Sequence, residues 1–153
     1  MKLYRIVKTE HIASAWSGYG AQQFGGRWNH PGRAMVYTAS SISLAMLEIL
    51  VHLQKSQFMS SYSLLSIEIP DKKLLNLDSD KLSRKWNTYP ALDETMDVGD
   101  KWLEEGKSVG LIVPSVIIPL EKNVVLNPAH PDFSGYIKEQ TIQLVSFDSR
   151  LIK

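Results

Sequence analysis

Short alternations of apolar and polar residues predict a series of β-strands along the chain. The clearest alternation covers residues 61–69, where Leu65, Ile67 and Ile69 would share one face and Ser66 the other. Six further segments have the composition of strands, and they cover residues 2–8, 34–39, 111–113, 116–118, 123–126 and 141–147. Pro114 separates two of these segments. Because proline cannot donate a ladder hydrogen bond, we expect this region at a sheet edge or with a bulge.

Two segments show the apolar spacing of helices. The first follows Ser40 and Ser41, which are candidate N-cap residues, and runs to about Leu53. The second covers residues 93–105, with Trp102 in its apolar pattern and Gly106 as the C-cap. Residues 17–32 are rich in turn-forming residues, and we interpret them as a long ordered loop, a kind of segment that is often functional.

The order of these elements is strand, long loop, strand, helix, strand, helices and then three strands. This irregular alternation favours an α+β fold over a doubly wound parallel sheet. We therefore expect a mixed sheet with flanking helices, in a single domain over residues 1–153.

Composition and charge narrow the function classes. Lys plus Arg number 17 and Asp plus Glu number 16, a net charge of +1 that does not favour direct contact with nucleic acid. The absence of cysteine excludes disulfides, thiolate chemistry and zinc sites built on sulfur. We recognise no signal peptide and no membrane-spanning stretch, so we expect a cytoplasmic protein without membrane contact.

Glu48 is the first candidate for chemistry, because apolar residues cover most of the circumference of its helix. A carboxylate in such surroundings must be paired, protonated or facing a cleft. A structural ion pair, with an arginine or with His52, and a solvent-facing edge are the alternatives.

Residues 25–33 form the second candidate. Paired glycines allow close approach of the backbone to a ligand, and Arg27 beside them can hold a phosphate in bidentate fashion. Arg33 could share this role, and Trp28 is the best candidate to stack on a ligand. The spacing fits neither a Walker loop nor a Rossmann loop. The alternative is a surface loop with a solvated arginine.

Two further polar residues stand in apolar or rigid surroundings. Ser115 lies in an apolar run but lacks the flanking glycines of a serine-hydrolase elbow, so we expect its hydroxyl to bind a ligand or another side chain. Asn127 begins a proline-rich turn that it could simply cap. The four histidines show no pair with the spacing of a zinc helix, and we predict no metal.

Taken together, the segments of the chain resemble the RES-domain family, the toxin half of RES–Xre toxin–antitoxin pairs. Their order and spacing, rather than any one of them, carry the resemblance. The segments are Tyr4-Arg5-Ile6, Gly26-Arg27-Trp28-Asn29, Gly32-Arg33, Val36-Tyr37-Thr38-Ala39, Ala45-Met46-Leu47-Glu48, Pro114-Ser115, Asn127-Pro128-x-His130-Pro131 and Phe147-Asp148-x-Arg150-Leu151.

The resemblance implies a fold like that of diphtheria-toxin-type ADP-ribosyltransferases, with a cleft for NAD+. It implies that Arg27, Glu48 and Ser115 are the name-giving residues and that Tyr37 joins them, with Arg33, Trp28 and Asn127 as substrate-binding candidates. The implied activity is cleavage of the nicotinamide–ribose bond of NAD+, which is substrate rather than cofactor, with phosphate or water as acceptor. The implied partner is an Xre-type helix-turn-helix antitoxin that blocks the cleft and represses the operon.

Two alternatives remain open. The first is transfer of ADP-ribose to a protein. Transferases of that class often carry a second acidic residue two positions before the glutamate, where this chain has the apolar Met46. The second is a non-enzymatic binding module, whose surface could be formed by aromatic residues such as Trp16, Tyr19 and Phe24.

Overall fold

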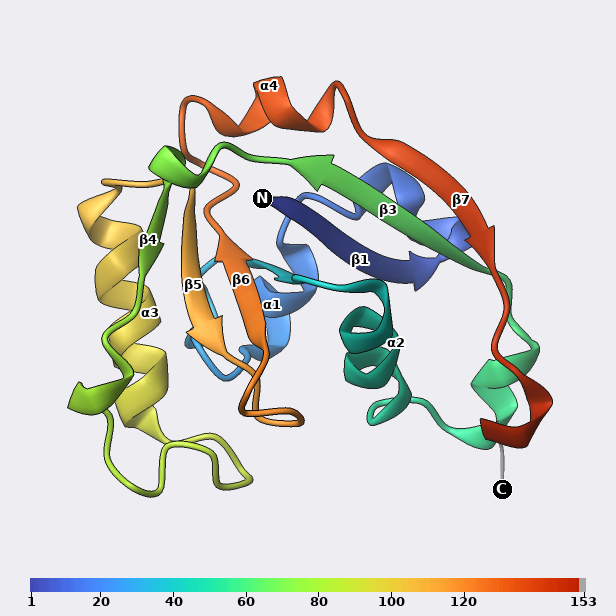
Figure 1. The fold of residues 1–153 in the computed structure, drawn as a ribbon, viewed down its shortest axis with the longest axis horizontal. Coiled ribbons are helices and arrows are strands. Elements are labelled where there is room, and N and C mark those ends of the chain that lie inside the picture. The colour runs from blue at the N-terminus through green and yellow to red at the C-terminus, as the bar shows by residue number, and fades with distance from the viewer. Residues whose placement is uncertain (152–153) are drawn as a thin grey trace.

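A seven-stranded sheet organises residues 1–151, the part of the chain that the computed structural model describes (Figure 1). The strand order is β4-β5-β6-β2-β1-β3-β7, and all neighbours are antiparallel except the parallel pair β4 and β5. This mixed sheet with helices confirms the predicted α+β class. The strands are β1 (Lys2–Lys8), β2 (Val36–Ala39), β3 (Tyr62–Glu68), β4 (Leu74–Asn76), β5 (Gly110–Pro114), β6 (Lys122–Leu126) and β7 (Thr141–Val145).

The helices are α1 (Tyr19–Phe24), α2 (Ile42–Leu50), α3 (Asp93–Glu105) and α4 (Phe133–Ile137). Helix α2 begins as predicted, because the Ser41 hydroxyl accepts a hydrogen bond of 3.1 Å from the Leu44 amide. Helix α3 also has its predicted bounds and ends at Gly106, whose φ of +59° is the left-handed conformation of a glycine C-cap. Within residues 1–151, none of the helices has the length and apolar character needed to cross a bilayer.

Three expectations about the elements are wrong. The loop over residues 17–32 contains α1. Strand β5 lies inside the sheet between β4 and β6, not at an edge, and it pairs with β6 in a continuous register without a bulge. Pro114 is its last residue, where the missing N–H costs little. Residues 116–118 form a turn region instead of a strand. The short elements β4 and α4 escaped the sequence analysis because three to five residues carry too little periodicity.

Strand β3 is buried on both faces, although its alternation predicted one solvent face. Ser66 is only 4% exposed, and its hydroxyl pairs with that of Thr141 on β7 at 2.6 Å. Ser63 pairs in the same way with Thr9 at 2.9 Å. The polar positions of this strand are therefore satisfied by neighbouring elements, as buried hydroxyls require.

Helices α2 and α3 pack against different parts of the sheet. Leu44 and Ala45 of α2 join a cluster with residues of β1, β2 and β3. Trp102 of α3 joins another with residues of β5 and β6, in the core as predicted, and Figure 1 shows α3 beside β4 and β5.

Candidate active site

A cleft of about 770 Å³ brings Arg27, Tyr37 and Glu48 together. Its walls come from β1, β2 and α2, from the loop after α1, from residues 89–91 and from the end of β5. This volume lies within the roughly 300–1,000 Å³ that small-molecule sites occupy. Three candidates that are separated in sequence therefore face a common space large enough for a ligand.

Glu48, on α2, is held by two side chains from other elements. Its Oε1 accepts hydrogen bonds from Ser115 Oγ at 3.0 Å and from Asn123 Nδ2 at 2.5 Å. Ser115 is fully buried, and its Oγ in turn accepts from the amides of Ile117 and Ile118, both at 3.1 Å. All hydrogen bonds of this carboxylate within residues 1–151 go to Oε1, which leaves Oε2 for a ligand in the cleft.

Tyr37, on β2, is fixed through its hydroxyl. The hydroxyl donates to Asn29 Oδ1 at 2.7 Å and accepts from the Trp28 amide at 3.0 Å. A Cβ at Gly26 would lie 2.5 Å from this hydroxyl, so glycine is required there. Burial raises the pKa of the Tyr37 phenol above its usual range, so the group is a neutral donor. The Asn29 amide nitrogen completes the network by donating to the carbonyls of Ala21, His30 and Arg33.

Arg27 connects its loop to residues 86–88. Its two terminal nitrogens donate to the carbonyls of Trp86 at 2.8 Å and Thr88 at 3.0 Å. Burial lowers the pKa of Arg27, while the nearby Tyr37 and Glu48 act to raise it. The guanidinium therefore lies in the field of the carboxylate and also holds the loop that forms one wall of the cleft.

Trp28 is placed differently from the expected stacking platform. Its side chain is 2% exposed and stacks on Trp86, with ring centroids 6.1 Å apart. The pair packs into the core cluster below α3. Trp28 thus stiffens the cleft wall, and its ring is not open to stack on a ligand.

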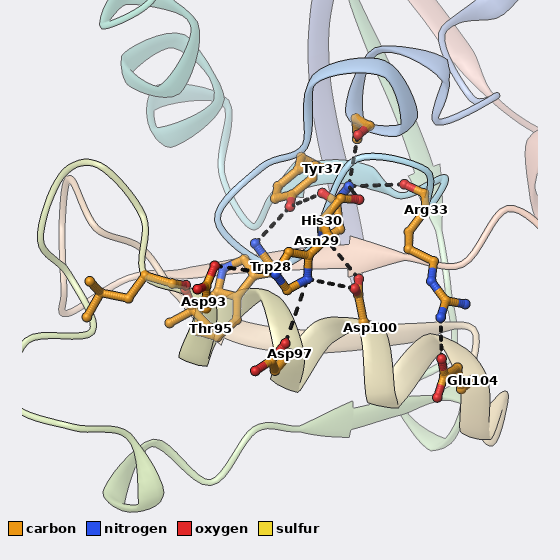
Figure 2. Close-up of polar contacts among 12 residues, drawn as sticks. Trp28, Asn29, His30, Arg33, Tyr37, Asp93, Thr95, Asp97, Asp100 and Glu104 are labelled. Carbon is orange, nitrogen blue, oxygen red and sulfur yellow. Dashed lines mark hydrogen bonds and ion pairs between the residues drawn. The ribbon is translucent and has the colours of Figure 1, made fainter.

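Helix α3 lies alongside the loop that carries Asn29, His30 and Arg33 and binds it through acidic side chains (Figure 2). Asp100 accepts hydrogen bonds from the His30 amide at 3.2 Å and from its ring Nδ1 at 2.9 Å. Asp93 and Asp97 lie 3.5 and 3.8 Å from the same ring, and they belong to the same face of the helix. No cluster of His, Asp and Glu suited to a metal ion occurs in the described part of the chain.

Two binding candidates lie outside the cleft lining. Arg33 is exposed and pairs with Glu104 of α3. Asn127 is buried at the end of β6, where its Oδ1 accepts from the Ala129 amide at 3.0 Å, the turn-capping arrangement. Their proposed contacts with a substrate stay predictions that this placement does not favour.

Two site residues were missed by sequence reasoning. Asn123, near the start of β6, pairs with Ala39 of β2 and donates to Glu48 on the helix that follows β2, a contact that only the folded chain shows. Arg5, in the middle of β1, lines the cleft with its guanidinium buried. Arg5 lies between Tyr4 and Ile6 in a strand that also carries Lys2 and Lys8, so the sequence carries little signal that this charge would be buried.

Comparison with known proteins identifies the class to which this fold and cleft belong. The sequence matches the RES domain family over residues 2–148. The chain therefore belongs to the RES domain family, as the sequence segments indicated.

The similarity to individual proteins is consistent with this family assignment. The chain is 47% identical over 151 residues to "Toxin Res" of Yersinia enterocolitica, covering 99% of both proteins. It is 40% identical over 140 residues to the "Prs ADP-ribosylating toxin" of a Sphingobium species, covering 90% of this chain and 86% of that protein. Its fold is similar to that of a chain in the crystal structure of the M. tuberculosis MbcT–MbcA toxin–antitoxin complex, with a TM-score of 0.74 and 22% sequence identity. The match covers 99% of this chain and 86% of that chain.

Proposed function

We propose that this protein is the toxin of a toxin–antitoxin pair and that it destroys NAD+ in the cytoplasm. The nicotinamide–ribose bond breaks, and nicotinamide leaves as a neutral base with the bonding electron pair. An oxygen of phosphate or water then bonds to the ribose carbon, which gives ADP-ribose 1″-phosphate or ADP-ribose plus a proton. The observation that carries this proposal is the fixed Glu48 carboxylate in a cleft with Arg27 and Tyr37.

The carboxylate suits this reaction because loss of nicotinamide leaves positive charge on the ribose. A negative group held in place before the reaction stabilises such a charge without reorganisation. Ser115 and Asn123 supply that fixation through Oε1, so Oε2 can face the ribose. In this scheme Ser115 orients Glu48 and does not itself touch the substrate.

Tyr37 and Arg27 would bind the nicotinamide ring and the pyrophosphate of the substrate. The ring of Tyr37 lines the cleft while its hydroxyl is bound behind it, an arrangement that allows stacking on nicotinamide. Arg27 lies near Glu48 and carries positive charge, which suits the pyrophosphate of the substrate.

An antitoxin is the partner we propose, of the Xre type, with its own helix-turn-helix region making any DNA contact. Three of the residues that line the cleft are apolar and strongly exposed: Phe24, Val51 and Tyr89, exposed by 86%, 61% and 90%. Exposed apolar residues grouped in this way are typical of interaction sites. A toxin–antitoxin complex among proteins of similar fold supports the same assignment.

The test is NAD+ consumption by purified protein with and without inorganic phosphate. We expect Glu48→Gln to lower the rate by about a hundredfold or more and to leave the circular dichroism spectrum unchanged. Glu139→Gln, at an exposed position outside the cleft lining, is the matched control. A folded Glu48→Gln protein with full activity would refute the proposal, and a phosphate-dependent rate would identify phosphate as the acceptor.

Transfer of ADP-ribose to a protein is the second candidate, because one relative carries the name of an ADP-ribosylating toxin. Met46, two positions before Glu48, is half-buried against the α2 cluster and offers no second carboxylate. Incubation with labelled NAD+ and cell lysate separates the two reactions. Label on protein bands supports transfer, and label in free small molecules supports NAD+ destruction.

A further inference from the structure

The sheet ends in two edge strands, β4 and β7, which differ in how their free edges are protected. An edge strand leaves a row of N–H and C=O groups without strand partners, and proteins normally shield it with short length, charged residues or proline. Strand β4 has three residues and directly follows Lys72 and Lys73. Strand β7 has five residues, and the stretch from Gln140 to Phe147 contains neither a charge nor a proline. Of the two edges, β7 is therefore the one that can accept another strand.

Strand β7 also carries exposed apolar side chains. Ile142 is 46% exposed and Leu144 is 80% exposed. Alternate residues of a strand share a face, and the register with β3 places these two on the face of Leu65, beside the core cluster that Leu65 joins. Figure 1 shows β7 as the outermost strand, beyond β3. The free edge therefore borders an apolar strip that residues 1–151 leave open to solvent.

The apolar positions of β7 are self-complementary about Gln143. When two copies of the strand pair antiparallel with Gln143 opposite Gln143, each Ile142 lies opposite Leu144 of the second copy. The two apolar pairs then share one face of the joined sheet, where directly opposite side chains contact each other. An interface between identical chains about a two-fold axis requires this kind of self-complementary surface.

The charges on either side of β7 match in the same arrangement. Lys138 and Asp148 are exposed and lie equally far from the centre of the strand, so the two-fold brings opposite charges together at both ends. Glu139 falls opposite Phe147 of the second copy, so it faces no like charge. Asp148 already binds Arg150 of its own chain, and exposed ion pairs are weak. The charges therefore favour the register, and the affinity comes from the backbone groups and the apolar pairs.

We propose that β7 is a self-association edge and that two copies of this chain pair antiparallel through it, about Gln143, into a dimer with one continuous sheet. The pairing uses the free backbone groups of both strands and covers Ile142 and Leu144 of both copies. It stops at two copies because β4, the other edge, is short and flanked by charge. The residues that line the cleft come from other elements than β7, so the inference does not rest on the proposed reaction.

The first test follows the oligomeric state with concentration. Sedimentation equilibrium of the purified full chain, from about 1 µM to about 1 mM, should show a shift from the monomer mass towards twice that mass. Leu144→Lys should raise the dissociation constant of the dimer by about tenfold or more, because each dimer loses two apolar pairs and gains two charges at the edge. Leu75→Lys, at the exposed leucine of β4, is the matched control and should dimerise as wild type does.

The second test examines the register. Because Gln143 lies on the two-fold axis, a charge introduced there faces the same charge of the second copy. Gln143→Lys alone and Gln143→Glu alone should each weaken the dimer, since like charges directly opposite each other are destabilising. An equimolar mixture of the two variants should form a heterodimer, because opposite charges then face each other. Gln143 is exposed, and circular dichroism checks that both variants are folded.

Three results would overturn the inference. A wild-type chain that stays monomeric over this range would leave the edge to a strand of another protein, such as an antitoxin. A dimer that Leu144→Lys does not weaken, or that Leu75→Lys weakens equally, would place the interface elsewhere. A mixture of the two Gln143 variants that stays monomeric would exclude pairing about this residue. A chain that dimerises through β7 but does not consume NAD+ would instead refute the proposed reaction alone.

Discussion

Ser115 shows how one buried hydroxyl can set the position of a charged group. Its oxygen accepts from two backbone amides and donates to Glu48 Oε1, so its rotation is fixed from three sides. Asn123 adds a second donor from the neighbouring strand. Hydrogen bonds to a charged acceptor are stronger than neutral ones, and together these two donors hold the carboxylate in a single orientation.

Ser115→Ala should therefore affect stability and activity together. Two partly buried amides and one carboxylate oxygen lose a partner, which should lower the free energy of unfolding by about 1–3 kcal/mol. Because Ser115 acts through Glu48, kcat should fall more than KM rises. Urea denaturation and steady-state kinetics measure the two effects. Ser134→Ala, at an exposed position on α4, is the control, and a Ser115→Ala protein with wild-type stability and kcat would contradict this role.

At the scale of elements, α3 is the support on which the Arg27 loop rests. Its Gly99 lies directly against Trp28, where a Cβ would be only 1.7 Å from the Trp28 carbonyl oxygen. The next residue, Asp100, binds the His30 amide and ring. The helix and the loop are therefore in contact through their backbones at Gly99 and Trp28. We expect this contact to set the position of the neighbouring Arg27 and Asn29 relative to Tyr37.

Gly99→Ala should destabilise the protein by about 1–3 kcal/mol or more, because the added methyl group must displace the backbone at Trp28. Helix propensity alone predicts the opposite sign, a gain of about 1 kcal/mol. Gly135→Ala on α4 is the matched control, since a Cβ there meets no atom within 4 Å. Thermal or urea unfolding of both variants decides the sign, and a stabilised Gly99→Ala protein would refute the close contact.

At the scale of the whole molecule, the net charge is only +1, but acidic side chains are concentrated on one helix. Three aspartates of α3, Asp93, Asp97 and Asp100, surround the single imidazole of His30. The hydrogen bond to Asp100 is the main cause that raises the pKa of His30, with the three carboxylates adding to it. The charge state of His30 therefore connects solution pH to the attachment of the loop on α3.

The sign of the pH effect follows from this raised pKa. The stabilisation by charged His30 is fully present below the unfolded pKa of about 6.5 and is lost as pH rises through the higher folded pKa. Wild type should thus be more stable than His30→Gln in mildly acidic solution, and the difference should shrink towards alkaline pH. Urea unfolding of both proteins across this range measures it. His11→Gln, at an exposed position, is the control, and a difference independent of pH would contradict the assignment.

Part of this architecture could be predicted from local signals. The bounds of β1 and α3 and the N-cap of α2 follow from periodicity and capping residues within a few positions of one another. The internal position of β5 and the burial of Ser66 were missed, because both depend on which strands lie alongside. Strand order is a non-local property that no short window of sequence contains.

The candidate site, too, could be predicted from the sequence only in part. The sequence by itself determined the residue types and therefore the available chemistry: a carboxylate in an apolar helix, an arginine beside glycines and a serine in an apolar run. Only the tertiary structure decided that Glu48 is held by Ser115 and Asn123, that Trp28 is enclosed, and that Arg5 faces the cleft. The physical reason is that charge, size and periodicity are local, whereas hydrogen-bond partners and desolvation are set by elements that meet only when the chain folds.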